Sequence, residues 1–301
     1  MNTRYARKGF TLIELLVVIT ILGILAALLF PAFARVKENG RRTACASHER
    51  QLGMAMLQYV SDNNERFPYQ NGFPGAKWVS QSYPYVRNVQ IYQCVDDDTT
   101  ARLVNGRRYS VDSYAMNSNL MGLVLAWLGG GDTARHPNPT LAVLSSSSQT
   151  VMFFEVSNDE ASLTPVNEAP TEGAATGNGA DDCARMQGTT LGPATFPCGD
   201  GAEYTDINGI NPLYATGNIG GRTLNGGAGS TPRHGEGSNY VACDGHARWL
   251  RPETVSGGKS AVAEDCFQGT DSRQPADCSQ QATKLAAGTA SGKYSLTFSS
   301  K

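Results

Sequence analysis

Residues 8–30 read Lys-Gly-Phe-Thr-Leu-Ile-Glu-Leu-Leu-Val-Val-Ile-Thr-Ile-Leu-Gly-Ile-Leu-Ala-Ala-Leu-Leu-Phe. Between Phe10 and Phe30 the only charged side chain is Glu14. A helix rises about 1.5 Å per residue, so about 20 such residues span the ~30 Å hydrocarbon core of a bilayer. This stretch therefore predicts a membrane-spanning helix near the N-terminus.

Three basic side chains, Arg4, Arg7 and Lys8, stand just before this apolar stretch. Basic residues next to a membrane helix favour the cytoplasmic side of the membrane. We therefore expect a single-pass protein whose N-terminus is cytoplasmic and whose body, which follows the helix, is exported.

Glu14 is unusual because a charge deep in a membrane helix costs roughly 2.5–3.5 kcal/mol on insertion scales. If a leader is removed before Phe10, its own chain offers only the new α-amine of Phe10 nearby. Pairing with the α-amine of an adjacent subunit is one hypothesis, and it would set the register between helices. A shallow, solvated position at the membrane interface is the other, and the position of Glu14 alone leaves both open.

The segment Lys8-Gly9-Phe10-Thr11-Leu12-Ile13-Glu14 resembles the class III signal of type IV pilins and type II secretion pseudopilins. The resemblance implies that a prepilin peptidase cuts between Gly9 and Phe10, that Phe10 is then methylated, and that Glu14 is the assembly carboxylate. It also implies the bacterial inner membrane as the location and other pilin or pseudopilin subunits as partners.

An ordinary secretory signal peptide is the alternative for this segment. Ala32-Phe33-Ala34 resembles an A-x-A cleavage site. Such a signal usually has an apolar core of about 7–15 residues, however, and the stretch here is longer and contains Glu14.

After Pro31 apolar residues continue at helical spacing, with charged and polar residues between them. We predict one helix from about Phe10 to about Asn63, and an amphipathic helix of this kind needs a surface to pack on, most simply a β-sheet. The expected fold is α+β and pilin-like: a long N-terminal α-helix packed on an antiparallel β-sheet, with a loop-rich C-terminal region. The predicted divisions are a leader (1–9), a transmembrane and assembly helix (10–34), an amphipathic stem helix (35–63) and a globular head (64–301).

Within the head, the pattern from residue 64 to residue 92 predicts irregular structure. Strands are expected at Tyr109–Asn117, Gln149–Val156 and Lys293–Phe298, and a hairpin at Asn239–Leu250. The hairpin turn is expected at Asp244-Gly245, because a type I′ turn needs a positive φ at both central residues. Residues 158–231 are rich in Gly and poor in large apolar residues, so a long insertion loop is expected there.

A second resemblance comes from the spacing of Arg233-His234 and Asp244-Gly245, which are separated by nine residues. This spacing resembles the H-X9-DG element of a large pilin-like family known as DUF1559. Three further segments are similar to that family: Arg42–Tyr59, Tyr92–Cys94 with the acids after it, and Asp112–Asn117. His234, Asp244 and Gly245 are interpreted as a structural motif, in which a His234–Asp244 hydrogen bond would connect the loop to the hairpin.

Seven cysteines occur without a C-x-x-C pair, so neither a zinc ribbon nor a thioredoxin-like site is indicated. Exported chains with this many cysteines usually form disulfides. The candidate pairs are Cys183–Cys198, Cys266–Cys278 and Cys45–Cys94, although spacing does not determine connectivity.

Asp200, Glu203, Asp206 and Asn208 lie close together among glycines, and oxygen ligands on such a loop suit calcium. This is a weak calcium candidate, since the spacing does not fit an EF-hand. We expect no other metal and no cofactor.

The formal net charge of −2 indicates no basic surface for nucleic acid, so we expect no nucleic-acid partner. The sequence contains no G-x-S-x-G, H-E-x-x-H or Walker motif, so we expect a structural protein and not an enzyme. The expected function is a subunit of a type IV pilus-like or type II secretion pseudopilus filament. The alternatives are an extracytoplasmic protein that binds a glycan or another partner, and a secreted enzyme, each held by the same anchor.

Overall fold

The computed structural model describes residues 11–71, 78–101, 103–104, 107–108, 110–117, 120–124, 140–157, 160–161, 176–177, 213–217, 219, 231–256 and 294–298. The chain divides into two compact units, Met1–Arg41 and Arg42–Lys301.

The helices are the α-helices α1 (Leu12–Asp62) and α2 (Trp78–Val86) and the 3₁₀ helices η1 (Val89–Tyr92), η3 (Leu141–Val143) and η6 (Pro252–Thr254). The strands are β1 (Tyr69–Asn71), β2 (Leu103–Val104), β3 (Arg107–Arg108), β4 (Ser110–Val111), β5 (Tyr114–Asn117), β6 (Gly122–Val124), β7 (Val151–Ser157), β8 (Glu160–Ala161), β9 (Thr176–Gly177), β10 (Leu213–Tyr214), β11 (Ser238–Ala242), β12 (Ala247–Leu250), β13 (Val255–Ser256) and β14 (Leu296–Thr297).

The predicted long helix is confirmed, since α1 runs over 51 residues and includes Pro31. Its first part, in the unit Met1–Arg41, has mainly apolar residues as far as Phe33. Its second part, from Arg42, carries the buried residues of the helix, which are Cys45, Glu49, Leu52, Gly53, Ala55, Met56 and Val60.

The main sheet of the second unit has the order β12-β11-β7-β5-β9, and β10 pairs with the end of β7. The four strands β12, β11, β7 and β5 are antiparallel neighbours, and β9 adds a short parallel pair at the edge. The fold is therefore α+β, with a long N-terminal helix and a central antiparallel sheet, as predicted.

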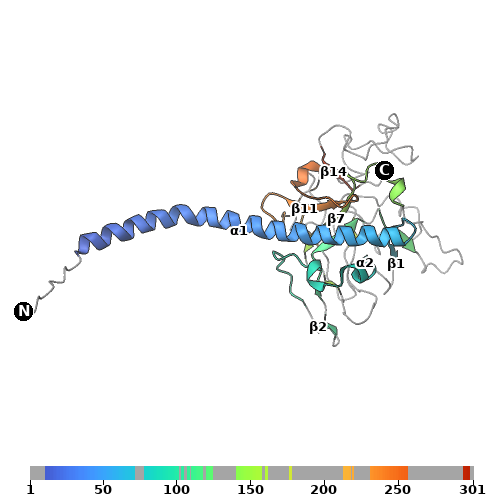
Figure 1. The fold of residues 1–301 in the computed structure, drawn as a ribbon, viewed down its shortest axis with the longest axis horizontal. Helices are drawn as coiled ribbons and strands as arrows, with labels where there is room; N and C mark the ends of the chain where they lie inside the picture. The colour runs from blue at the N-terminus through green and yellow to red at the C-terminus, as the bar shows by residue number, and fades with distance from the viewer. Residues whose placement is uncertain are drawn as a thin grey trace, which may run out of the picture. The chain divides into compact units, whose positions relative to one another are not determined.

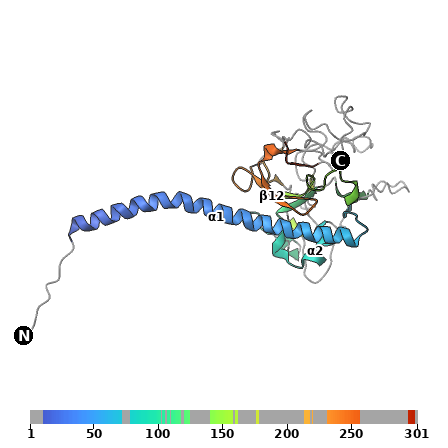
Figure 2. The same ribbon diagram turned by 45° about the horizontal axis from the view of Figure 1, so that its top comes forward.

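Both ribbon views place the part of α1 after Arg42 alongside this sheet (Figures 1 and 2). The two come close at Gly53, where an added Cβ would lie 2.7 Å from Cγ1 of Val241 in β11. Leu52 and Met56 of α1 share one buried cluster with Phe153 of β7 and Val241. The amphipathic stem therefore buries its apolar side against the sheet, as its periodicity predicts.

A second apolar cluster contains other residues of β7 and β11. It includes Phe154, Val156 and Tyr240, and it is completed by Leu296 and Phe298 from the end of the chain. Phe154 and Phe298 are in edge-to-face contact at 5.1 Å between ring centroids. The predicted strand at Lys293–Phe298 thus exists as the shorter β14, which pairs in parallel with β13.

Other predicted elements need correction. The segment from residue 64 to residue 92 is not entirely irregular, because it holds α2 and η1. Tyr109–Asn117 is not one strand, because Asp112 and Ser113 separate β4 from β5. The Asn239–Leu250 hairpin forms, but only Gly245 of the Asp-Gly pair has a positive φ, so the turn is not type I′. Most of residues 158–231 lies outside the described residues.

Gly237 lies where two chain segments approach closely beside the hairpin. A Cβ built there would lie 2.5 Å from the carbonyl oxygen of Leu250 and 2.8 Å from Cε2 of Trp249. Because a backbone oxygen cannot rotate away, we expect Gly237→Ala to lower the free energy of unfolding by about 1–3 kcal/mol. Chemical denaturation of the detergent-solubilised chain measures this effect.

The matched control for this prediction is Gly40→Ala, since a Cβ at Gly40 in α1 meets nothing within 4 Å. That variant is expected to be unchanged or up to about 1 kcal/mol more stable, because Ala favours a helix over Gly. If Gly237→Ala and the wild type had the same free energy of unfolding, the close contact between Gly237 and the Leu250 carbonyl oxygen would be contradicted.

Candidate functional site

The first candidate site is the start of α1, where Glu14 hydrogen-bonds with Thr11. The Thr11 backbone N–H donates to Oε2 of Glu14 at 2.8 Å, and the Thr11 hydroxyl donates to the same oxygen at 2.7 Å. The Glu14 N–H donates back to the Thr11 hydroxyl at 3.3 Å. This is a capping box, which satisfies backbone donors at a helix start. The expectation that only the α-amine of Phe10 could partner Glu14 within its own chain is therefore wrong.

Gly9 and Phe10, the predicted cleavage and methylation residues, lie outside the described residues. Directly after them, α1 exposes large apolar side chains from Leu12 to Phe33. Leu12 is 82% exposed and Phe30 is 73% exposed, although burying such a side chain stabilises by about 1.5–3 kcal/mol. A surface of this kind needs lipid or other apolar helices around it.

Among the described residues, α1 is the one helix that is long and apolar enough to cross a membrane. Its most apolar window has a mean hydropathy of 2.9, and none of that window is buried. Length and composition thus agree with the predicted membrane-spanning segment.

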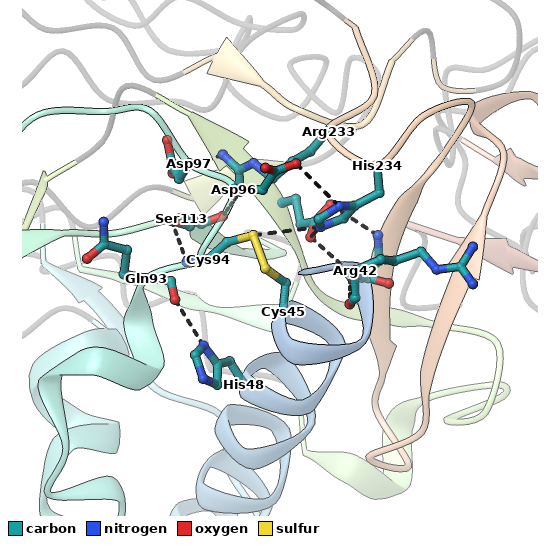
Figure 3. The surroundings of a disulfide bond; sticks show 12 residues. Arg42, Cys45, His48, Gln93, Cys94, Asp96, Asp97, Ser113, Arg233 and His234 are labelled. Atoms are coloured by element: carbon teal, nitrogen blue, oxygen red, sulfur yellow. Dashed lines mark hydrogen bonds and ion pairs between the residues drawn. A yellow bond between two sulfur atoms is a disulfide. The ribbon is translucent and has the colours of Figure 1, made fainter. Parts of the chain in front are cut away.

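The second candidate site surrounds a disulfide between Cys45 and Cys94, which confirms that predicted pair. Cys45 lies on α1, and Cys94 follows η1, as Figure 3 shows. The Cys94 N–H donates to the Ser113 hydroxyl at 2.9 Å. The bond closes a separation of 49 residues, which is worth about 4 kcal/mol in the entropy model of a cross-linked unfolded chain.

His234 lies beside this disulfide and is almost fully buried. Its Nε2 is 3.7 Å from Sγ of Cys94 and 3.0 Å from Oε1 of Glu155. Its Nδ1 is 3.8 Å from Oδ2 of Asp96. The imidazole is therefore held between two carboxylates, with one ring nitrogen facing the disulfide (Figure 3).

Glu155 is fully buried in β7 and is positioned by Asn239 of β11. The Asn239 backbone N–H donates to Oε2 of Glu155 at 3.1 Å, and its side-chain amide donates to Oε1 at 3.0 Å. The same amide donates to the carbonyl of Arg42 at 3.3 Å. The sheet and α1 are thus joined by polar contacts as well as by apolar packing.

Arg233 is the buried cation of this region. Its guanidinium is 2.9 Å from Oδ2 of Asp97, and it donates to the carbonyl oxygens of Ser113 and Val156. Charge-assisted hydrogen bonds of this kind are stronger than neutral ones. Arg233 therefore joins the segment after η1 to β7.

Four donor atoms in this region lie within 4.8 Å of one another, and all four residues are buried. We call this group the disulfide cluster, and it consists of Cys45, Cys94, Glu155 and His234. Sulfur, imidazole nitrogen and carboxylate oxygen together form the donor set that zinc prefers.

Glu49 of α1 is buried without a hydrogen bond to either carboxylate oxygen among the described residues. Burial raises its pKa well above the usual value, the negative charge of Glu155 raises it further, and the positive charge of Arg233 opposes this. Tyr114 of β5 is also near, and burial raises its pKa well above the usual value. The folded state therefore favours the protonated form of Glu49 more than the unfolded state does.

A pH dependence of stability follows from Glu49. The folded state holds this proton more tightly than the unfolded state does, so the free energy of unfolding falls as pH rises above about 4.5, by up to about 1.4 kcal/mol per pH unit. We expect Glu49→Gln to remove this contribution and to be more stable than the wild type at pH 8. Denaturation of both oxidised proteins between pH 5 and pH 8 measures the two slopes.

Glu236→Gln is the control, because Glu236 is an exposed partner of Arg251 and should leave the wild-type slope unchanged. Parallel pH profiles for Glu49→Gln and the wild type would contradict the assignment of a buried proton to Glu49.

The expected hydrogen bond between His234 and Asp244 is replaced by other pairs. The Asp244 carboxylate accepts from the His246 N–H at 3.0 Å and lies 2.9 Å from His246 Nδ1, whereas His234 faces Glu155. Gly245 has a φ of +84°, and its N–H donates to the carbonyl of Ala242 to close the turn. Asp244 and Gly245 thus shape the hairpin turn, and His234 belongs to the disulfide cluster.

The remaining predicted site residues lie outside the described residues. They are the weak calcium candidate (Asp200, Glu203, Asp206 and Asn208) and the cysteines 183, 198, 266 and 278. Sequence reasoning missed Glu49, Glu155 and Asn239, all of them buried and polar. One signal was present for Glu155, because it is the only charged residue in the strongly apolar strand β7.

The start of the chain matches known families in two adjacent segments. Residues 4–30 match the prokaryotic N-terminal methylation motif, and residues 34–122 match a protein family of unknown function, DUF1559. No solved structure matches the chain.

Two curated relatives are named type II secretion system core protein G. The protein from Pectobacterium carotovorum subsp. carotovorum is 44% identical over 64 residues, which are 21% of this chain and 40% of the relative. The protein from Klebsiella pneumoniae is 34% identical over 82 residues, which are 27% of this chain and 59% of the relative.

The chain thus spans about half the length of the curated relatives it matches. The two resemblances drawn from the residues, to prepilins and to DUF1559, are both confirmed over these segments. Residues 4–122 of this chain accordingly combine a prepilin-type N-terminal methylation motif with a DUF1559 segment.

Proposed function

We propose that this chain is a structural subunit of a filament of the type II secretion pseudopilus kind. The observation that carries the proposal is the exposed apolar part of α1, from Leu12 to Phe33, which overlaps a methylation motif and contains one carboxylate, Glu14. The relatives named type II secretion system core protein G favour a pseudopilus over other filaments.

Processing is the first step of the proposed function. A prepilin peptidase cuts between Gly9 and Phe10, and the new N-terminus at Phe10 is methylated. The leader then takes Arg4, Arg7 and Lys8 with it. The match of residues 4–30 to the methylation motif supports this assignment.

Assembly is the second step. The apolar side chains from Leu12 to Phe33 leave the lipid and pack against the same helices of other subunits. During this transfer Glu14 needs a partner of opposite charge, because an unpaired charge in an apolar surrounding is costly. The α-amine of Phe10 in an adjacent subunit supplies that charge. In the free subunit, the capping hydrogen bonds from Thr11 hold the carboxylate at the helix start.

The proposed location is the bacterial inner membrane, with the head on the extracytoplasmic side. The basic residues before the apolar stretch favour this orientation. The Cys45–Cys94 disulfide agrees with it, because disulfides persist in oxidising compartments and not in the cytosol.

A structural role, and not catalysis, is proposed for the head. His234 and Glu155, its best candidates for acid–base chemistry, are buried and pair with each other. The calcium hypothesis at Asp200, Glu203, Asp206 and Asn208 stays a prediction, and loss of calcium binding on replacing Asp206 with Asn would test it.

The test of the proposed function is assembly in a bacterium that has a type II secretion system and its prepilin peptidase. We expect the processed chain in the filament fraction that mechanical shearing releases from overproducing cells. The matched control is the same strain without the prepilin peptidase, where the chain should stay in the membrane fraction. A chain that remains in the membrane in both strains would contradict filament assembly.

A further inference from the structure

The disulfide cluster has a composition that a disulfide alone does not explain. Four chain segments, α1, the residues after η1, β7 and the segment before β11, each bring one metal-binding side chain to the same buried point. We propose that the dithiol form of this protein binds one zinc ion through Sγ of Cys45, Sγ of Cys94, Nε2 of His234 and Oε1 of Glu155. This inference goes beyond the proposed filament function.

The distances in the oxidised cluster are close to those of a tetrahedral site. Zinc bonds of about 2.3 Å to sulfur and about 2.0–2.2 Å to nitrogen and oxygen place neighbouring ligand atoms about 3.3–3.8 Å apart. In the cluster, Nε2 of His234 is 3.7 Å from Sγ of Cys94 and 3.0 Å from Oε1 of Glu155. Reduction lets the two sulfur atoms separate to the spacing that a tetrahedral site needs.

The surroundings of these residues match those of metal ligands. Ligating histidines usually direct their second ring nitrogen at a carboxylate, and Nδ1 of His234 lies 3.8 Å from Oδ2 of Asp96. Asn239 orients the Glu155 carboxylate through two hydrogen bonds. The Cys94 N–H is held by Ser113. The Asn239 backbone N–H donates to Oε2 of Glu155, the oxygen that is not assigned to zinc, whereas the Asn239 amide donates to Oε1, whose second lone pair is the one assigned to zinc.

The two states exclude each other, because the sulfur atoms that bond to each other in the disulfide are the same atoms that bind zinc as thiolates. Thiol–disulfide exchange with a dithiol gives the two protein thiols and leaves the dithiol as its own disulfide. Binding of Zn²⁺ then releases the two thiol protons, and Nε2 of His234 gives up the proton that it shares with Glu155, leaving a neutral imidazole protonated at Nδ1 beside Asp96. In either state, α1 stays cross-linked to the segment after η1, by a covalent bond or by the metal.

Cobalt(II) tests the site, because it reports tetrahedral thiolate coordination by visible and near-ultraviolet absorption. The experiment uses the full processed chain, purified from membranes in detergent, reduced with a phosphine under anaerobic conditions and titrated with Co²⁺. We expect one Co²⁺ per chain with a thiolate charge-transfer band, its displacement by Zn²⁺, and no such band in the oxidised protein.

Variants separate this cluster from the other cysteines. The double variant Cys45→Ser, Cys94→Ser keeps the other five cysteines and should lose the band, as should His234→Ala. Cys243→Ala is the matched control, since Cys243 is a buried free thiol outside the cluster, and it should keep the band. Asp96→Asn should keep the band but weaken binding roughly 10–100-fold, as expected for a residue that positions a ligand.

Far-UV circular dichroism of each variant shows whether the head is folded. The proposal is overturned if the reduced wild type binds no Co²⁺, or if the double cysteine variant binds it with an unchanged spectrum. It is also overturned if Asp96→Asn, with a native circular dichroism spectrum, binds as tightly as the wild type. Filament assembly of the oxidised wild type is measured separately, so failure of the zinc site and failure of the proposed function are distinguishable.

Discussion

Gly9→Val is expected to leave residues 1–9 attached to the chain and to abolish its appearance in filaments. A peptidase that cuts directly after Gly9 binds a residue that has no side chain at this position. The β-branched side chain of Val would occupy the space next to the bond that is cut, so we expect cleavage to be blocked. Intact mass spectrometry of the membrane-purified protein should show a species longer by the leader and without a methyl group on Phe10.

Gly23→Ala is the control for this prediction. Gly23 lies inside α1, where an added Cβ meets nothing within 4 Å, so processing should be as in the wild type. A Gly9→Val chain that is cut and methylated normally would refute the assignment of the cleavage site.

Glu14→Val is expected to be processed normally but to reduce the filament yield at least tenfold. The substitution removes the carboxylate that would pair with the α-amine of the neighbouring subunit. It also removes the two hydrogen bonds that the Glu14 carboxylate accepts from Thr11, whereas the backbone N–H of residue 14 still donates to the Thr11 hydroxyl. Quantifying the chain in sheared filament and membrane fractions measures the loss.

Two further variants show whether a loss of filament yield in Glu14→Val is due to the missing charge. Thr11→Ala removes the hydroxyl of the cap but keeps the carboxylate, so a defect confined to Glu14→Val assigns the effect to the charge. Glu253→Val makes the same change at an exposed position of the head and should assemble normally. Wild-type filament yield from Glu14→Val would refute the pairing hypothesis.

The long helix and the central strands could be predicted because their signals are local. An apolar stretch followed by helical periodicity predicts about residues 10–63, and α1 spans Leu12–Asp62. Gln149–Val156 predicts a buried strand, and β7 is the strand to which β5, β10 and β11 all pair.

The helix α2 was missed because its local signals are contradictory. Pro84 lies inside it, and Pro usually interrupts a helix. Burial of Trp78, Val79 and Ser82 stabilises it instead, and Tyr85 donates a hydrogen bond to Asp62 of α1 at 3.0 Å. These tertiary contacts override the local preference, and spacing along the chain does not reveal them.

The disulfide cluster could be predicted only in part. Its two cysteines and His234 were predicted as candidates, but Glu155 and the residue that orients it, Asn239, were not. Glu155 and Asn239 are 84 residues apart in the chain, so their contact leaves no local pattern in the sequence. Only the pairing of β7 with β11 brings them together. Glu155 is a carboxylate in an apolar strand. Considered together with His234, it would have predicted a buried polar site.

The most direct test of the account is the N-terminus of the mature protein. Purification from the membrane of a bacterium with an active prepilin peptidase, followed by intact mass and N-terminal fragment mass spectrometry, defines it. The account predicts a chain that starts at Phe10 and carries one N-terminal methyl group. A chain that starts near Arg35, after Ala32-Phe33-Ala34, would contradict it, because the apolar helix would then be removed before it could anchor or assemble anything.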